Sequence, residues 1–372
     1  MNWPIRVSNL AQLIGCGGSW VMQAIHPEAP DAINQAAAEG TAAHEAAALV
    51  LKGEAPDAMG FIGWTASNGV QLDRSLCEAA AMYVRDVQRI AAEGGTLHVE
   101  ESIEVIPDVL GGTPDAWHHF GSKITIWDFK SGHNSVEAYE NWQLLGYLMG
   151  ILRKMGINGL QDGFIRVDLR IVQPRARHRL GSVRSWTFVA DAARGYFNVI
   201  ADTCSKVLLA ESTTRTGSHC LYCSARANCE AATKAAGAAL EFIGSTSSIP
   251  LEPEAAAYEL ELLERAIEAA KTRRGGLLEV VEHSIRSGKQ IAQFVLEPKY
   301  GRDSWSVPDE NLFIMGDALG VDLRNTKPIT PTQAIAAGMS PDVVNTIRDR
   351  KASGFELVRA DASTAKQIFG SN

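Results

Sequence analysis

The sequence contains no long hydrophobic run and no secretory signal. No stretch of about 18 consecutive apolar residues occurs along the chain, so neither a transmembrane helix nor a membrane partner is expected. The N-terminal segment MNWPIRVSNL lacks a basic region followed by an apolar stretch, so secretion is not expected either. These absences predict a cytoplasmic protein.

Cysteine and positive charge are both scarce. Six cysteines in a reducing compartment indicate a metal or redox site rather than disulfides, although Cys77 and Cys204 stand apart and are expected to be buried thiols. The net charge of −8 disfavours a protein that coats nucleic acid, yet acidic metal ligands and a local basic groove coexist in nucleases. No glycine-rich loop follows a predicted strand, which disfavours a nucleotide-dependent oxidoreductase.

The hydrophobic periodicity predicts alternating helical and strand segments. Helices are expected at 5–25, 31–52, 73–93, 136–154 and 190–210, and strands at 97–106, 112–119, 123–129, 163–173 and 183–189. The second helix is expected to break at Gly40, with Thr41 capping its second part. Helices placed around a strand meander predict an α/β protein with a mixed sheet.

Two domains are expected from the length of 372 residues and from one polar segment. Residues 244–254 (GSTSSIPLEPE) are small and polar and contain proline, which is typical of a linker. We therefore expect a larger domain at 1–243 and a smaller, mainly helical α+β region at 255–372, with a long helix at 254–287.

Two aspartates and a lysine are expected to meet on neighbouring strands. Asp115 and Asp128 fall on adjacent predicted strands, and Lys130 shares a face with Asp128 because it lies two residues further on. Carboxylates of this kind hold Mg²⁺ or Mn²⁺, and a lysine beside them orients or deprotonates the attacking water in phosphodiester hydrolysis. The alternative is a surface salt bridge at the end of a hairpin.

The surrounding residues resemble the motif series of RecB-like, PD-(D/E)XK nucleases. The segments GTPDAW (112–117), ITIWDFKSG (124–132) and NWQLLGY (141–147) contain an Asp, a D-x-K and a Q-x-x-x-Y in the order found in that family. The resemblance implies a restriction-endonuclease-like core of a mixed sheet flanked by helices, and DNA hydrolysis. It assigns catalytic roles to Asp115, Asp128, Lys130, Gln143 and Tyr147.

The same resemblance implies a set of metal ligands. They are His44 in the upstream segment AEGTAAHE, Asp115, Asp128 and the carbonyl of Phe129. Taken alone, a histidine such as His44 in an alanine-rich helix is more often an ordinary packed or exposed residue than a ligand. Either Glu100 or Glu101 adds a further acidic group, and strand alternation does not decide between them.

Three cysteines are closely spaced near the end of the larger domain. Cys220, Cys223 and Cys229 form a C-x2-C-x5-C pattern, and a closed site needs a fourth thiolate, for which Cys16 is the candidate. The pattern resembles the iron–sulfur staple of AddB and of CRISPR-associated adaptation exonucleases, which implies a [4Fe–4S] cluster. Zinc remains the alternative because four cysteines suit it equally.

A basic segment follows the predicted active site. Residues 166–184 contain six arginines and a single acid, Asp168. We expect phosphate contacts from Arg170, Arg175, Arg177 and Arg179; the alternative is a solvated basic hairpin. No helix has a base-reading pattern, so DNA is the expected partner through its phosphate backbone, at ends or in single strands.

The leading prediction is a metal-dependent DNA exonuclease. Its exonuclease action and its role in phage recombination or replication are implied by the family resemblance, because the C-terminal region resembles the tail of phage and prophage members. A phage-encoded protein of this kind acts in the host cell cytoplasm, with a recombination or replication protein as partner. Its C-terminal region could contact DNA or a partner protein, or simply pack. The alternative is a non-catalytic DNA-binding or recombination accessory protein, stapled by a cluster or by zinc.

Overall fold

A computed structural model gives the fold of the chain. The residues that it describes are 3–27, 35–157, 164–176, 178, 181–245, 252–300, 304–305, 309–325, 327–336, 339–349 and 352–359. The chain divides into two compact units, Met1–Leu277 and Leu278–Asn372. This division falls within a helix that follows the predicted linker at 244–254, and residues 246–251 of that linker lie outside the described residues.

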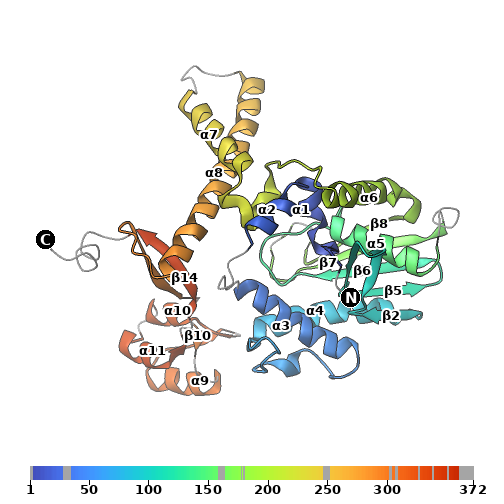
Figure 1. The fold of residues 1–372 in the computed structure, drawn as a ribbon. Helices are drawn as coiled ribbons and strands as arrows, with labels where there is room; N and C mark the ends of the chain where they lie inside the picture. Colours follow the sequence, from blue (N-terminus) through green and yellow to red (C-terminus); the bar gives the residue numbers. More distant parts are fainter. Residues whose placement is uncertain are drawn as a thin grey trace. The chain divides into compact units, whose positions relative to one another are not determined.

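A five-stranded mixed sheet forms the centre of the first unit (Figure 1). Its strands, in spatial order, are β2 (Thr96–Val99), β5 (Ala116–Phe120), β6 (Lys123–Phe129), β7 (Arg166–Val172) and β8 (Val183–Val189). The pairing of β6 with β7 is parallel, and the other pairings are antiparallel. The parallel pair needs a crossover connection, and this crossover contains helix α5 (Trp142–Lys154). The predicted α/β class with a mixed sheet is confirmed.

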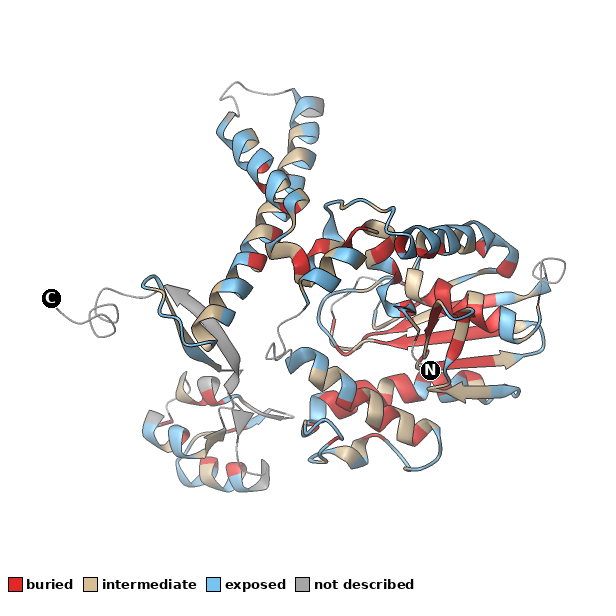
Figure 2. Cartoon of the chain, viewed as in Figure 1, coloured by how far each residue is buried: buried red, intermediate tan, exposed pale blue. Residues whose placement is uncertain are grey.

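Helices cover both faces of this sheet (Figure 1). On one face lie α1 (Leu10–Gly15), α5 and α6 (Arg194–Leu208), and on the other lie α3 (Gln35–Leu51) and α4 (Arg74–Ala91). The buried residues accordingly concentrate in the sheet and on the helix faces that pack against it (Figure 2). Strand β6 is buried from Ile124 to Phe129, because neither of its faces meets solvent.

The N-terminal segment is more divided than the single predicted helix at 5–25. It consists of β1 (Ile5–Arg6), a short 3-10 turn, α1 and α2 (Ser19–Ile25), with Cys16 between the two helices. Strand β1 completes a small sheet with β3 (Ile103–Ile106) and β4 (Leu110–Gly112).

Three predicted boundaries near the site are wrong. Helix α3 runs through Gly40 without a break, and the Thr41 hydroxyl donates to the Ala37 carbonyl (3.1 Å) instead of capping a new helix. The predicted strand at 97–106 is two strands in different sheets, β2 and β3, separated by Glu100 at a φ of +52°. The predicted strand at 112–119 likewise divides into β4 and β5, so Asp115 lies just before a strand and not within one.

The C-terminal part of the chain contains further helices and several short strands. Helices α7 (Glu230–Ser245) and α8 (Pro253–Arg286) end the first unit, and α8 extends into the second. The second unit further contains β9 (Phe294–Tyr300), β10 (Ser304–Trp305), α9 (Asp309–Ala318), β11 (Arg324–Asn325), β12 (Lys327–Pro328), α10 (Pro331–Ala336), α11 (Pro341–Ile347), β13 (Arg348–Asp349) and β14 (Ala352–Arg359). Within the described ranges, no helix is long and apolar enough to cross a bilayer.

Candidate active site

A buried carboxylate–ammonium pair lies at the end of strand β6. The Nζ atom of Lys130 is 3.0 Å from Oδ1 and 2.9 Å from Oδ2 of Asp128. The Asp128 side chain is 3% exposed and that of Lys130 is 31% exposed, so the lysine reaches inward from the rim of the site. Oδ2 of Asp128 has no partner with hydrogen-bond geometry among the described residues, although the ammonium is near. An acceptor buried in this way is available to a further ligand.

Asp115 faces the same strand end from the neighbouring chain segment. Ala116 pairs with Trp127 in the β5–β6 ladder, which places Asp115 opposite Asp128. Oδ2 of Asp115 accepts the backbone N–H of Phe129 (2.6 Å), and Oδ1 lies 3.2 Å from Nδ1 of His44. Helix α3 therefore delivers His44 to the site from one face of the sheet.

Glu100 completes a three-residue group that could hold a metal ion. One ligand atom each of His44, Glu100 and Asp115 lies within 4.8 Å of the others; we call this set the His–Glu–Asp group. The backbone N–H of Glu100 donates to the Asp115 carbonyl (3.2 Å), and its φ of +52° is uncommon for a residue other than glycine. Such strain concentrates at functional sites. Glu101 faces elsewhere and accepts hydrogen bonds from Trp117 and Lys154.

The electrostatics of the site favour the binding of a cation. Burial, together with the Asp115 carboxylate, raises the pKa of Glu100 to about 7. Burial alone would lower the pKa of His44, but the Asp115 carboxylate outweighs it and raises that pKa to about 9. Burial and the nearby Asp115 also raise the pKa of Asp128, despite the opposing effect of Lys130. Because the carboxylates crowd like charges together, a divalent cation would relieve their repulsion, and its binding to His44 would displace the imidazole proton.

Helix α5 supplies two further groups from the opposite face of the sheet. The helix begins at Trp142, where the Asn141 side chain accepts the N–H of Leu144 (3.1 Å) as a cap. In its first turn, Gln143 donates to Oδ1 of Asp128 (3.0 Å) and accepts from the Lys130 ammonium (3.2 Å). Tyr147 points to another partner, since its hydroxyl donates to the Thr113 carbonyl (3.0 Å). Gln143 thus orients the acid–lysine pair, while Tyr147 fixes the segment before Asp115.

The loop between Lys130 and α5 is held by one buried amide. Gln173 is 1% exposed, and its Nε2 donates to the carbonyls of Gly132 (2.9 Å) and Asn134 (2.7 Å). Its Oε1 accepts from the backbone of Val136 (3.0 Å) and from Arg184 (2.6 Å). All four hydrogen bonds of the amide are used, so the main chain that follows the lysine has a defined path.

The predicted phosphate-binding arginines do not form one open surface. The guanidinium of Arg170 donates to Asp86 (2.9 and 3.0 Å) and to Asp168 (2.9 Å), and its side chain is 12% exposed. The donors of Arg170 are thus used inside the protein, which disfavours the predicted contact with DNA. Arg175 is half-buried and pairs with Glu39 (3.1 Å).

Of the remaining arginines that the structure describes in this segment, Arg166 is exposed and Arg184 is buried. Arg177 and Arg179 lie outside the described residues. Arg184, from the same basic segment, is 2% exposed and bonded to backbone carbonyls and to Gln173. Among the described arginines that were predicted to bind phosphate, Arg175 is thus the more exposed, and its side chain is only partly so.

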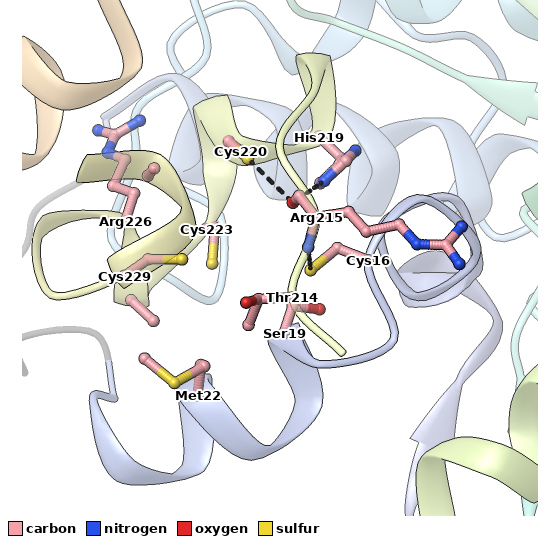
Figure 3. A pocket seen from close by; sticks show the side chains of 12 residues that line it. Cys16, Ser19, Met22, Thr214, Arg215, His219, Cys220, Cys223, Arg226 and Cys229 are labelled. Atoms are coloured by element: carbon pink, nitrogen blue, oxygen red, sulfur yellow. Dashed lines mark hydrogen bonds between the residues drawn. The ribbon is translucent and has the colours of Figure 1, made fainter. Parts of the chain in front are cut away.

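Four of the six cysteines line one pocket (Figure 3). They are Cys16, Cys220, Cys223 and Cys229, and we call this the four-cysteine pocket. Their side chains point toward a common space from segments about 200 residues apart in the sequence (Figure 3). Burial and the neighbouring thiols raise the pKa of Cys220 and Cys223, so a bound cation is needed to hold them as thiolates.

The sulfur atoms of the four-cysteine pocket are less closely grouped than the ligand atoms of the His–Glu–Asp group. Among the described residues, the His–Glu–Asp group is the only set of three such ligand atoms that lie within 4.8 Å of one another. No three of the cysteine sulfurs therefore come that close together. Cys77 and Cys204 are buried elsewhere, as predicted.

The family of the chain follows from a match that covers both the candidate active site and the four-cysteine pocket. A family model described as a protein of unknown function, DUF2800, matches residues 8–283. The chain belongs to the DUF2800 family. In this DUF2800 member the match includes the His–Glu–Asp group, the Asp128–Lys130 pair and all four cysteines of the pocket.

A solved structure is similar to part of this DUF2800 protein. The crystal structure of SSO0001 aligns with 14% sequence identity over 41% of this chain and 76% of that chain, with a TM-score of 0.26. So low a TM-score supports no functional conclusion. The function of this family member therefore has to be inferred from its own side chains.

Proposed function

We propose that this protein is a metal-dependent DNA nuclease with a PD-(D/E)XK-type core. The observation that carries the proposal is the buried Asp128–Lys130 pair at the end of β6, with the His–Glu–Asp group beside it. The carboxylates of this group suit Mg²⁺ or Mn²⁺. The unsatisfied Oδ2 atom of Asp128 fits a further bond to such an ion.

The roles of the residues follow from their contacts. A bound divalent cation would polarise the phosphate group and lower the pKa of its bound water. The His–Glu–Asp group and Asp128 would hold it. Burial lowers the pKa of Lys130, but the Asp128 carboxylate outweighs this effect and raises it above its usual value, so the side chain remains an ammonium at neutral pH. Lys130 then orients the water and offsets negative charge on the phosphate, while Gln143 keeps the pair aligned.

The substrate class and the biological role complete the proposal. We expect hydrolysis of DNA from its ends, with recognition of the phosphate backbone and no sequence preference. The resemblance to RecB-like phage and prophage nucleases favours a role in recombination or replication, in the host cytoplasm, with a recombination or replication protein as partner.

A time course with end-labelled DNA tests this function. Single- and double-stranded substrates are incubated with and without Mn²⁺, and the products are separated by length. Progressive shortening that requires Mn²⁺ is expected, and the label shows which end is attacked. Binding that weakens with salt, without any cleavage, would instead support a non-catalytic DNA-binding protein.

We further propose that the four-cysteine pocket holds a [4Fe–4S] cluster. The four thiols lining one pocket and the joining of Cys16 to the later cysteines both support this cofactor. The cluster would close a loop of about 200 residues and thereby restrict the unfolded chain. Anaerobically purified protein is expected to be brown and to contain iron and acid-labile sulfide. Stoichiometric zinc without iron would contradict the cluster.

Replacement of Glu100 tests whether its carboxylate is a metal ligand. Glu100→Gln removes one carboxylate from the His–Glu–Asp group, so the Mn²⁺ concentration for half-maximal cleavage should rise by at least about 10-fold. Glu101→Gln is the matched control, because the adjacent side chain points to Trp117 and Lys154. A Mn²⁺ titration of both variants checks this. Equal behaviour of the two would exclude Glu100 as a ligand.

A further inference from the structure

A buried hydroxyl in the four-cysteine pocket has no partner within the described part of the chain. Ser19 is the first residue of α2, is 2% exposed and lines the pocket with the cysteines (Figure 3). Among the described residues, its Oγ makes no hydrogen bond. A serine in the first turn of a helix normally bonds to nearby backbone or to water, and a buried hydroxyl without a partner is costly. Some group in the pocket should accept this hydrogen bond.

The backbone around Ser19 is held in place by two hydrogen bonds and by a close approach at Gly18. The N–H of Ser19 donates to the Cys16 carbonyl (3.0 Å), and the N–H of Gly18 donates to the Thr213 carbonyl (3.1 Å). A Cβ atom at Gly18 would lie 2.6 Å from the Thr213 carbonyl carbon, so only glycine permits this approach. Ser19 is thereby held next to Cys16 in the wall of the pocket.

One backbone group of the pocket already donates a hydrogen bond to a cysteine sulfur. The backbone N–H of Arg215 donates to Sγ of Cys16 (3.2 Å). The side chains of Arg215, Arg226 and His219 also line the pocket. A cubane with four thiolate ligands carries net negative charge, which N–H and O–H donors to its sulfurs stabilise.

We infer that Ser19 donates an O–H···S hydrogen bond to a sulfur of the cluster and thereby raises its reduction potential. This inference rests on the proposed iron–sulfur cofactor. Hydrogen bonds to cluster sulfurs favour the reduced form, because that form carries more negative charge. With the Arg215 N–H, which donates to Sγ of Cys16, Ser19 would be the second hydrogen-bond donor to the sulfurs of the pocket. The pocket then tunes the cluster as well as holding it.

Ser19→Ala tests the role of the hydroxyl without changing the cysteines. The control is Ser212→Ala, because Ser212 lies against Gly17 in the same region but does not line the pocket. Both proteins are purified anaerobically, their iron is counted, and their midpoint potentials are measured by titration with dithionite. The rate at which the visible absorbance bleaches in air is measured in parallel.

The expected result is a full iron content with a more negative midpoint potential in Ser19→Ala alone. Loss of one hydrogen bond should also speed bleaching by about 2- to 10-fold. If Ser19→Ala binds no cluster, Ser19→Thr, which keeps the hydroxyl, should restore it. Unchanged potential and bleaching in an iron-loaded Ser19→Ala protein would overturn the role of Ser19 and leave the cofactor intact. Absence of iron from the wild-type protein would overturn the cofactor itself.

Discussion

Replacement of Lys130 by methionine is expected to abolish metal-dependent DNA cleavage while the protein remains folded. Methionine keeps the length of the side chain but removes the ammonium that lies 2.9 Å from Asp128. Loss of a single preorganised donor to a developing negative charge costs about 10²- to 10³-fold in rate. Asp128→Asn removes a metal-binding charge from the same pair, so its loss should be at least as large. Initial rates with end-labelled DNA at saturating Mn²⁺ measure both effects.

Lys154→Met is the matched control for this prediction. Lys154 pairs with Glu101 away from the strand end, and its side chain is 44% exposed. Its replacement should leave the rate unchanged within about twofold, because exposed ion pairs contribute little. Circular dichroism of all three variants establishes that each is folded. Wild-type rates in folded Lys130→Met or Asp128→Asn protein would show that the pair has no part in cleavage.

The core of this site could be predicted from the sequence because strand geometry is regular. Side chains two residues apart share a face of a strand, so the positions of Asp128 and Lys130 fix their meeting once β6 is recognised. The helical spacing of Gln143 and Tyr147 is less informative. It places both on one face of α5, yet in the structure only Gln143 contacts the pair.

Glu100 could not be chosen from the sequence because the backbone is irregular there. A continuous strand at 97–106 would place Glu100 and Glu101 on opposite faces without indicating which face is the site. The chain instead turns at Glu100, with its φ of +52°, and passes from one sheet to the other. A non-glycine residue in this conformation has no sequence signature.

Gly40 shows why a glycine can mislead the prediction of a helix boundary. Glycine weakens helices, so its presence predicts a break. In the structure a Cβ atom at this position would lie only 3.0 Å from Oγ of Ser131, the residue that follows Lys130. The glycine therefore allows α3 to lie close to Ser131, just after the end of β6, and the helix continues so that His44 reaches Asp115.

The arginines could not be assigned from charge density alone. Six arginines in nineteen residues (166–184) suggest a phosphate-binding surface. The acidic partner of Arg170 is Asp86, which lies on α4 and 84 residues earlier in the chain. Only the packing of α4 against the sheet brings this carboxylate to the strand. The apparent excess of positive charge is thus partly neutralised by residues distant in sequence.

Replacement of Arg170 by methionine is expected to destabilise the protein without changing how DNA binding depends on salt. Arg170 donates to both oxygens of Asp86 and to Asp168, whose side chains are 9% and 11% exposed. Its removal leaves two buried carboxylates without their shared cation, which costs about 3–5 kcal/mol of unfolding free energy. Urea denaturation measures this loss. Arg166→Met, at an exposed position of the same strand, should change stability by less than about 0.5 kcal/mol.

The pH dependence of stability gives an independent measure of the same network. Burial raises the pKa of Asp86, but hydrogen bonds from Arg170 and Arg89 outweigh it and hold that pKa below its usual value. Its contribution is therefore complete above the unfolded pKa of about 3.9 and is lost as the pH falls through the lower folded value. Arg170→Met should flatten this acid limb of the stability curve. A variant with wild-type stability but a smaller salt slope for DNA binding would instead make Arg170 a phosphate contact.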